Sequence, residues 1–440
     1  MEHLLHYVWK HKLFPLKALQ TTDGLPLEVI DPGLHNSDAG PDFFNAKVKI
    51  GDTLWVGNVE IHSCSSDWHR HGHGDDKAYD SVILHVVSEA DAGVSRSDGT
   101  PIPQFCLEIP ERVQKHYREL CDAEQYPACC SILASLPKLT VHSWLTALQR
   151  ERLEQKATLI TDRLKRFNLH WEDAFLITLA RNYGFGLNGD AFETWATLLP
   201  FRAMEKHRND LFQIEAFFFG VAGLLEESFL AKEEEDEYSL RLRKEFRYLQ
   251  HKFGIAKVME PTQWRFLRLR PDNFPHIRLA QLAYLYQKDD KLFSQLLEAE
   301  SLEDVRRLLS TRTSDYWEEH YMFGRSSARK VRTMGERSLN LIVINTLVPF
   351  LYTYGMHKGG EKMCRRAARF LEELEAEDNH IIRSWHTAGL PVSTAADSQA
   401  LIQLRKEYCD KRKCLYCRFG YEYLRYTPRE KETKQADNQL

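Results

Sequence analysis

The sequence predicts an α+β protein, in which a small N-terminal domain of helices and strands is followed by a large α-helical domain. Hydrophobic residues alternate with polar ones in short segments of residues 1–110, as in half-buried strands. From about residue 137 they recur with the spacing of helices instead. The length of 440 residues and the hydrophobic content of 43% fit two or three globular domains and exclude a largely disordered chain.

The N-terminal domain is predicted to cover residues 1–120 and to begin with a helix over residues 2–13. Alternation over residues 43–62 predicts a hairpin, because the turn residues Gly51 and Asp52 lie in its middle. A continuous apolar run at 81–87 and a shorter segment at 105–109 predict two further strands.

The helical domain is predicted to cover residues 121–427, and the polar residues 428–440 are expected to form a flexible tail. Helical spacing predicts helices at 141–167, 172–183, 190–199, 207–229, 237–252, 276–287, 290–298, 302–309, 338–354, 358–376 and 394–407. No repeat of the solenoid type interrupts this pattern.

Charge and histidine are unevenly distributed along the chain. Residues 1–110 contain 8 Lys and Arg against 16 Asp and Glu, together with 9 of the 19 His. Carboxylates and imidazoles are the groups from which metal sites and acid–base sites are built. The net charge of the whole chain is only −4, so no strong global field requires a nucleic acid or a membrane as partner.

The composition predicts a cytoplasmic protein without a membrane partner. No apolar run is long enough to cross a bilayer, and the N-terminus lacks the pattern of a secretion signal. Nine cysteines, an odd number, fit a reducing compartment better than a set of disulfides.

Two carboxylates of the predicted hairpin form a candidate metal site. Asp42 opens the first strand, and Glu60 lies near the end of the second. Carboxylates on rigid strands can bind Mg²⁺ or Mn²⁺, and such an ion can activate water for attack on a phosphodiester. His62 lies two residues beyond Glu60 and therefore faces the same side, where it can place the water or bind the phosphate.

The register of the hairpin decides whether these carboxylates meet. A two-residue turn pairs Ile50 with Thr53 and places Asp42 opposite Ile61, on the other face from Glu60. A one-residue bulge would instead bring Asp42 opposite His62, so the site requires a bulge or a strongly twisted strand entry. The same register puts Lys47 on the face of Glu60.

The order of these motifs resembles the PD-(D/E)xK nuclease superfamily. Pro41-Asp42 and Glu60-Ile61-His62 stand at the matching positions, after a helix and before a further helix and strand. The resemblance implies a restriction-endonuclease-like core and metal-dependent hydrolysis of DNA or RNA, with Asp42 and Glu60 as metal ligands and Glu2 as an accessory acid.

One position departs from the superfamily pattern, because His62 stands where the superfamily has Lys. Lys is a fixed cation at neutral pH, whereas His is mostly neutral. Lys47 is the nearest residue that can replace the missing charge. The departure keeps a second hypothesis open, a non-catalytic protein that binds nucleic acid or protein with a degenerate nuclease core.

The whole chain also resembles a bacterial family catalogued as domain of unknown function 2851. The resemblance rests on GPDF at 40–43, GNVEIH at 57–62, DWHRHGH at 67–73, YDSVILHVV at 79–87, RPDNFPHIRLAQ at 270–281 and YCDKRKCLYC at 408–417. This family carries no assigned activity, so the resemblance supports the architecture. It leaves open a third hypothesis, an interaction scaffold without a nucleic-acid role.

A cluster of polar residues after the hairpin is expected to line the site. It consists of His69, His71, His73 and Asp75. The spacing is similar to the zinc motif of metallo-β-lactamase-like hydrolases, but Asp76 stands in place of the last His. The alternative is a surface loop loosened by glycines. His85 lies within an apolar strand and is expected to be a core histidine rather than a ligand.

Three cysteines near the C-terminus form a second candidate metal site. They are Cys409, Cys414 and Cys417, and three thiols so close together can wrap Zn²⁺ or an iron–sulfur cluster. The segment lacks a fourth ligand, which Cys364 or His386 is expected to supply after folding. The alternative is that these cysteines are small apolar residues of a helical core.

Arginines of the helical domain are candidates for binding a phosphate backbone. Arg270 and Arg278 flank a loop that enters a helix, and further cationic stretches lie at 325–337 and 411–418. Each stretch can also be an ordinary solvated helix face. If these arginines bind phosphate, the expected partner is DNA or RNA. The sequence does not identify a protein partner.

Overall fold

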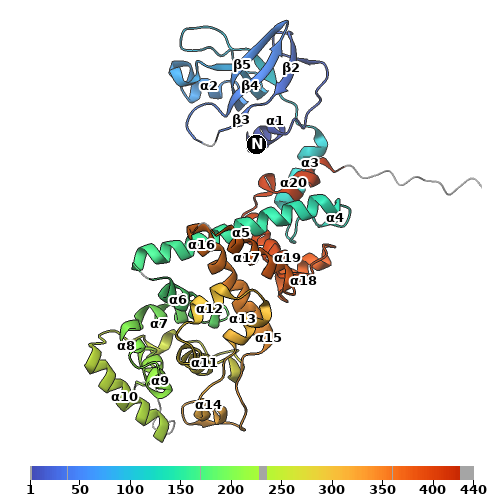
Figure 1. Ribbon diagram of the computed structural model, residues 1–440. Helices are drawn as coiled ribbons and strands as arrows, with labels where there is room; N and C mark the ends of the chain where they lie inside the picture. Colours follow the sequence, from blue (N-terminus) through green and yellow to red (C-terminus); the bar gives the residue numbers. More distant parts are fainter. Residues whose placement is uncertain (1, 37, 169, 227–234, 359, 427–440) are drawn as a thin grey trace, which may run out of the picture. The chain divides into compact units, whose positions relative to one another are not determined.

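The computed structural model describes residues 2–36, 38–168, 170–226, 235–358 and 360–426, and these divide into two compact units (Figure 1). The first unit contains the described residues of 1–140, 384–390 and 404–440, and the second contains those of 141–383 and 391–403. The class is α+β as predicted, with 56% helix and 12% strand. The predicted tail at 428–440 lies outside the described residues.

The first unit extends beyond the predicted boundary at residue 120. Helix α3 (Glu111–Asp122) contacts α20 (Arg418–Arg425), so the C-terminal helices belong with the N-terminal sheet. Tyr423 of α20 donates a hydrogen bond to Glu119 of α3 over 2.9 Å. Hydrophobic periodicity carries no information on such pairing between distant segments, which explains the difference.

A mixed sheet forms the centre of the first unit. Its strands are β1 (Leu19–Gln20), β2 (Pro26–Asp31), β3 (Leu34–His35), β4 (Phe43–Ile50), β5 (Thr53–Cys64), β6 (Val82–Glu89) and β7 (Gln104–Cys106). The strand order is β1-β2-β4-β5-β6-β7, with β3 paired to β4. Strands β2, β4 and β5 are antiparallel, whereas β6 runs parallel to both β5 and β7. Figure 1 shows β4 and β5 next to β2.

A bulge in β4 sets the position of Asp42. Ile50 pairs with Thr53, as predicted, and Ala46 pairs with Gly57, but Phe43 pairs with Val59. Strand β4 therefore has two residues between Phe43 and Ala46, whereas β5 has only one between Gly57 and Val59. Asn45, one of the two residues in β4, has a φ of +56°. Continued by one residue, this register brings Asp42 opposite Glu60. The sequence analysis predicts that a bulge brings Asp42 opposite His62, and this prediction is wrong by two residues.

Short helices complete the first unit. Helix α1 (Glu2–Lys10) contacts β5 and buries Leu4, Leu5, Val8 and Trp9, as its sequence spacing predicts. The others are α2 (Asp67–Arg70), η1 (His73–Asp75), η2 (Lys77–Tyr79), α4 (Cys130–Leu133), η7 (Leu404–Cys409) and η8 (Cys414–Tyr416).

The second unit is almost entirely helical. After α5 (Lys138–Phe167), which enters from the first unit, come α6 (Trp171–Tyr183), α7 (Gly189–Leu198), α8 (Phe201–Glu205), α9 (Leu211–Val221), α10 (Glu237–Phe253), η4 (Pro261–Gln263), η5 (Pro271–Asn273), α11 (Pro275–Lys288), α12 (Leu292–Glu298), α13 (Leu302–Leu309), α14 (Asp315–Glu319), α15 (Glu336–Ile342), η6 (Val343–Leu347), α16 (Val348–Lys358), α17 (Glu361–Glu373), α18 (His380–Thr387) and α19 (Ala395–Gln403). A small hairpin pairs β8 (His320–Met322) with β9 (Arg325–Ser326).

Most of these helices lie where their periodicity predicts, and α9 shows why one is shorter. A helix is predicted over 207–229, but Gly223 adopts a φ of +72° shortly after α9 ends at Val221. The Met259 carbonyl lies 2.1 Å from the position that a Cβ of Gly223 would take. Glycine ends the helix here because no larger residue fits.

One helical run, Glu336–Lys358, is long and apolar enough by composition to cross a membrane. Within the second unit 67% of its apolar window is buried, which is the burial expected of a core helix.

Candidate metal centre

Asp42 and Glu60 lie side by side where β4 begins. The main-chain N–H of Asp42 donates to Glu60 Oε2 over 3.1 Å, and the N–H of Ile61 donates to Asp42 Oδ2 over 2.9 Å. A main-chain N–H thus holds each carboxyl group beside the other one. Asp42 Oδ1 and Glu60 Oε1 take no part in these two bonds and can accept a cation.

Both carboxyl groups are held in a partly or fully buried environment that favours their protonated forms. Glu60 is only 5% exposed, and burial together with the charge of Asp42 raises its pKa well above the ordinary value. Burial also raises the pKa of Asp42, against the effect of His6, whose Nε2 lies 3.3 Å from Asp42 Oδ2. Glu2 on α1 raises the pKa of both groups further. The pair therefore binds either a proton or a cation.

Imidazoles surround the other side of Glu60. His62 Nε2 and His73 Nε2 lie 3.5 Å and 3.4 Å from Glu60 Oε1, and His71 Nδ1 lies 3.1 Å from His62 Nε2. In the described residues, His62, His71 and His73 are the group of three whose ligand atoms lie within 4.8 Å of one another. Ligand atoms around a tetrahedral Zn²⁺ lie about 3.4 Å apart, so this spacing suits one ion.

His62 and His73 have lowered pKa values, which favour the neutral imidazole that coordinates a metal. Burial and the neighbouring imidazoles lower the pKa of His62 to about 3, and burial lowers the pKa of His73. The fully buried His85 places Nε2 at 2.9 Å from His62 Nδ1, which orients the His62 ring with Nε2 toward Glu60. His85 is a core residue, as predicted, but it also touches the centre through His62.

The segment that carries His71 and His73 is fixed rather than loose. Gly72, with a φ of +72°, turns the chain between them. Trp68 is fully buried, and its Nε1 donates to the Ser95 carbonyl over 3.2 Å. The ring of Tyr79 stacks on His73 with centroids 3.8 Å apart. The interpretation of this segment as a glycine-loosened loop is therefore wrong for these two histidines.

Three other predicted site residues lie away from the centre. His69 Nε2 is 2.8 Å from the Gly93 carbonyl, and Asp75 is exposed in η1. Lys47 is exposed and pairs with Val56. This position lies four residues from Glu60 along β5, or about 13 Å, which is too far for a direct contact. Lys47 thus does not replace the missing lysine of the superfamily pattern.

His6 belongs to the centre although the sequence analysis does not single it out. It lies four residues after Glu2 on α1, and this spacing puts both side chains on one face of a helix. The spacing is thus a signal for the helix face that adjoins Asp42.

The two predicted phosphate-binding arginines differ in their surroundings. Arg278 is 6% exposed, donates to Gln281 Oε1 over 2.9 Å and to Asn273 Oδ1 over 2.6 Å, and lies over the ring of Phe185. It is a structural residue of the second unit, so its assignment to phosphate is wrong. Arg270 is exposed at the start of η5.

The three C-terminal cysteines do meet, but with a different fourth residue from those predicted. Cys409, Cys414 and Cys417 line one cavity together with Cys129. Cys364 instead belongs to the second unit, where its thiol lies 3.6 Å from the Tyr352 carbonyl. His386 does not line this cavity either.

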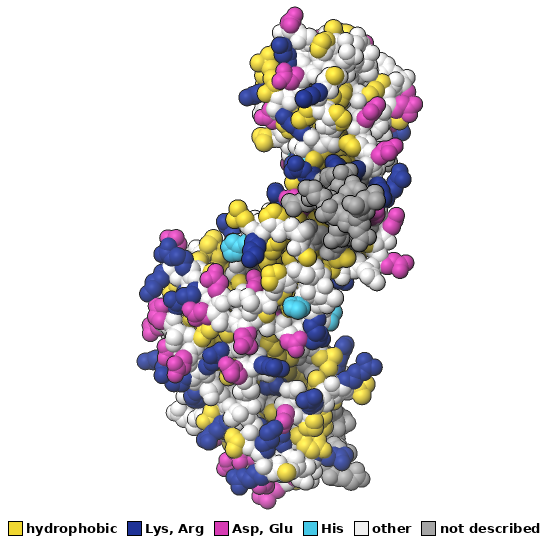
Figure 2. All heavy atoms as spheres, turned by 90° about the vertical axis from the view of Figure 1, so that its right-hand side faces the viewer, with side chains coloured by type: hydrophobic (Ala, Val, Ile, Leu, Met, Phe, Trp, Pro, Cys, Tyr) yellow, Lys and Arg dark blue, Asp and Glu magenta, His cyan; other side chains and the backbone are white. Residues whose placement is uncertain are grey.

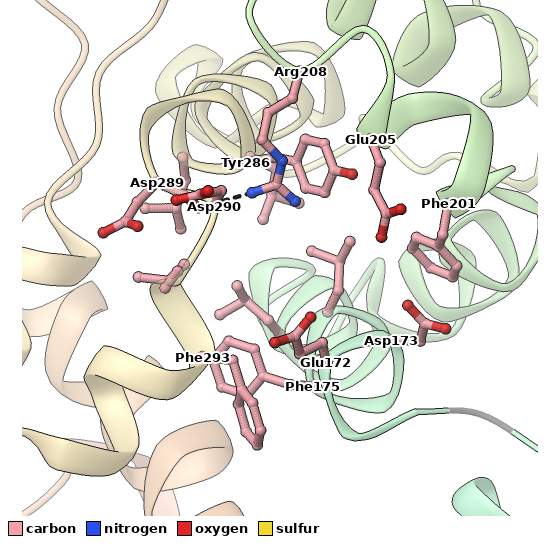
Figure 3. A pocket seen from close by; sticks show the side chains of 15 residues that line it. Glu172, Asp173, Phe175, Phe201, Glu205, Arg208, Tyr286, Asp289, Asp290 and Phe293 are labelled. Carbon is pink, nitrogen blue, oxygen red and sulfur yellow. Dashed lines mark hydrogen bonds between the residues drawn. The ribbon is translucent and has the colours of Figure 1, made fainter.

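A further cavity, of about 70 Å³, lies within the second unit (Figure 3). Arg208 lies over the ring of Tyr286, 4.0 Å from its centroid, and donates to the Asp289 carbonyl over 2.9 Å. Figure 3 shows the carboxyl groups of Asp173 and Glu205 beside this cavity, and burial raises the pKa of Asp173. The sequence pattern contains no signal for this cavity.

Fold and centre together define an α+β protein with a carboxylate–histidine cluster beside a bulged hairpin. The chain belongs to the family described as protein of unknown function (DUF2851), whose model matches residues 2–380. The match includes the centre and Cys129 but ends before Cys409. No curated protein and no solved structure matches the chain.

Proposed function

We propose that this protein is a metal-dependent hydrolase of phosphodiester bonds in DNA or RNA. The observation that carries the proposal is the pair of Asp42 and Glu60, held together by the backbone and faced by neutral imidazoles. The order of α1, the β4–β5 hairpin, α2 and β6 also agrees with the helix and strand order implied by the PD-(D/E)xK resemblance.

The side chains of the centre have separate roles in this proposal. Glu60 Oε1, with His62 and His73 at 3.5 Å and 3.4 Å, would hold a divalent ion. Such an ion lowers the pKa of a bound water and offsets charge on a phosphate oxygen. Asp42 would complete the oxygen ligands, and His6, 3.3 Å from Asp42 Oδ2, would exchange a proton with it.

The mixed ligand set bears on the choice of metal. Carboxylates suit Mg²⁺ and Mn²⁺, whereas imidazole suits Zn²⁺ and other transition metals. With two imidazoles this close to Glu60 and that of His71 next to His62, we expect Mn²⁺ or Zn²⁺ to bind more tightly than Mg²⁺. Metal binding would release a proton, because burial and Asp42 raise the pKa of Glu60 to about 9 in the absence of a cation.

The charges on one face of the second unit give little support for binding along a long stretch of nucleic acid. On the face of the second unit in Figure 2, Lys and Arg side chains are interspersed with Asp and Glu. An extended patch of one sign would favour tight binding along a duplex. We therefore expect binding with a modest dependence on salt, centred on the metal.

A cleavage assay tests the proposal. Purified protein would be incubated with single- and double-stranded DNA and RNA in Mg²⁺, Mn²⁺ or Zn²⁺, with EDTA as a blank. Asp42→Asn and Glu60→Gln keep the shape of the side chains but remove charge, and we expect each to lower the rate at least 100-fold. The matched control is Asp52→Asn, because Asp52 lies at the other end of the same hairpin. It is expected to retain wild-type activity.

Metal binding is measured separately from cleavage by calorimetric titration with Mn²⁺. We expect binding to the wild type and none to the double variant Asp42→Ala, Glu60→Ala. Unchanged cleavage in Asp42→Asn would contradict the proposal. Nucleic-acid binding that persists in EDTA, without cleavage in any metal, would support the non-catalytic binding protein, which His62 in place of lysine favours.

A further inference from the structure

Four thiols from two distant segments of the first unit line a single cavity. Cys129 lies directly before α4, and the others lie in η7, η8 and at the start of α20: Cys409, Cys414 and Cys417. All nine cysteines of the chain lie in its described part and are thiols rather than disulfides. The remaining walls are mostly apolar, from Leu120, Tyr126, Ala128, Tyr408 and Gly420. Cysteines in this arrangement are suited to binding a soft metal.

The segment from Cys409 to Cys417 is tightly wound by its own backbone. The N–H of Lys413 donates to the Tyr408 carbonyl over 2.8 Å, and the N–H of Cys417 donates to the Cys414 carbonyl over 3.2 Å. Gly420 allows α20 to approach this turn, because a Cβ there would lie 2.1 Å from the Cys414 oxygen. The backbone thus holds the three cysteines around the cavity without any contribution from a metal.

Two cations lie beside the cavity. The guanidinium carbons of Arg405 and Arg412 lie 4.5 Å and 5.9 Å from the centroid of the Tyr126 ring, which lines the cavity. Their positive charges would offset negative charge on thiolates that hold a metal.

The spacing of the sulfur atoms distinguishes a cluster from a single ion. Four thiolates around one Zn²⁺ lie about 3.8 Å apart. In the described residues, the set of three ligand atoms within 4.8 Å of one another is that of the histidines and contains no cysteine. No three of these sulfurs therefore lie as close together as three ligands of one Zn²⁺. Thiolates around a cluster of several iron atoms lie farther apart than those around a single ion, so a cluster suits the cavity better.

We propose that Cys129, Cys409, Cys414 and Cys417 bind an iron–sulfur cluster. The cluster joins the C-terminal segment to the chain before α4. The ring of Tyr421 on α20 lies 5.0 Å from the ring of His11, which directly follows α1. The cluster thereby stabilises the packing of the C-terminal segment at the end of α1, the helix that carries Glu2 and His6. This inference is independent of the proposed hydrolase activity.

Metal analysis of the full chain, purified without oxygen, tests the proposal. We expect iron and acid-labile sulfide in equal amounts and a broad absorption near 400 nm that bleaches on reduction. Cys129→Ser is expected to lower the iron content at least 10-fold. The matched control is Cys130→Ser, because Cys130 is the adjacent residue and is exposed, and it is expected to retain the cluster.

Two further measurements keep the test decisive if a variant does not fold. Wild-type protein would be reconstituted with iron and sulfide, or with zinc alone. Zinc that is bound at one equivalent and lost in Cys129→Ser, with no uptake of iron, would overturn the proposal, and so would the absence of any metal that depends on Cys129. Cys121→Ser addresses the fourth ligand, because Arg412, between Cys409 and Cys414, donates a hydrogen bond to the Cys121 carbonyl. Loss of iron in Cys121→Ser with retention in Cys129→Ser would overturn the assignment of Cys129.

Discussion

Asp42 and Glu60 are joined through the backbone: the N–H of Asp42 donates to Glu60 Oε2, while Asp42 Oδ2 accepts the N–H of Ile61. The bulge in β4 places the two residues opposite each other, so it brings the partly exposed carboxyl group of Asp42 next to the buried one of Glu60. Such a pair is unfavourable in the absence of a proton or cation. The fold therefore favours the binding of a cation next to Asp42 and Glu60.

The raised pKa of Glu60 predicts how stability depends on pH. Because this pKa is higher in the folded protein than in the unfolded chain, the folded state holds the proton more tightly. The free energy of unfolding therefore falls as pH rises between these two values. Between about pH 7.5 and 8.5, in EDTA, we expect a decrease of about 1 kcal/mol per pH unit in urea unfolding.

This interval lies above the titration of the histidines near Glu60. His62, His73 and His85 have lowered pKa values, so their contribution to the pH dependence is complete once the unfolded chain has lost these protons, above about pH 7.5. Glu60→Gln keeps the other titrating groups, so its slope should be smaller than that of the wild type by about 1 kcal/mol per pH unit. It should also be more stable than the wild type at pH 8.5. A wild type whose stability rises with pH over this interval would contradict the raised pKa.

A second prediction separates two neighbouring histidines. His71 Nδ1 lies 3.1 Å from His62 Nε2, whereas His69 Nε2 lies 2.8 Å from the Gly93 carbonyl. Both side chains are exposed, so replacement should change stability little. We expect His71→Ala to weaken binding of Zn²⁺ or Mn²⁺ at least 10-fold in calorimetry. His69→Ala should leave the affinity within about twofold, and equal losses in the two variants would argue against the group of His62, His71 and His73.

The sequence is sufficient for the elements that local pattern determines. Turn residues at Gly51-Asp52 determine the pairing of Ile50 with Thr53, and alternation identifies β4, β5 and β6. The α-helical character of the second unit follows from its periodicity in the same way. Asp42 and Glu60 could be selected as candidate ligands because both flank this hairpin.

Residues whose role depends on tertiary packing could not be recognised from the sequence. Beside the bulge at Asn45, β3 pairs with β4, and Gly33 directly before β3 lies so close to Phe44 that a Cβ on it would be 2.6 Å from the Phe44 oxygen. Cys129 joins the C-terminal cysteines only through the folding of the first unit. Arg278 is polar in sequence but buried in structure, where its two terminal nitrogens donate to Gln281 and Asn273.

A third prediction tests the different surroundings of the two arginines. Arg278→Ala leaves a cavity and removes hydrogen bonds to Asn273 and Gln281, so we expect a loss of about 2–3 kcal/mol in stability. Arg270→Ala removes an exposed side chain and should change stability by less than about 0.5 kcal/mol. Urea unfolding followed by circular dichroism measures both. Equal effects on stability would show that Arg278 is not the structural residue described above.

Arg270 also has a binding readout. If Arg270 contacts a phosphate, Arg270→Ala should reduce the slope of log affinity against log salt concentration by about one. An unchanged slope would assign Arg270 to the ordinary solvated surface.

The last prediction concerns Gly57, which pairs with Ala46 at the bulge and lies three residues before Glu60. A Cβ at Gly57 would lie 2.4 Å from Ile83 Cγ2 and 2.8 Å from the Ser81 oxygen, so Gly57→Ala must move β5 away from β6. We expect a loss of about 1–3 kcal/mol in stability from this overpacking. We also expect at least 10-fold weaker Mn²⁺ binding in calorimetry, because Glu60 and His62 lie on the displaced strand.

The matched control is Gly93→Ala, since no atom lies within 4 Å of its Cβ position. A stable Gly57→Ala variant with wild-type metal affinity would show that the approach of β5 to β6 does not position the centre.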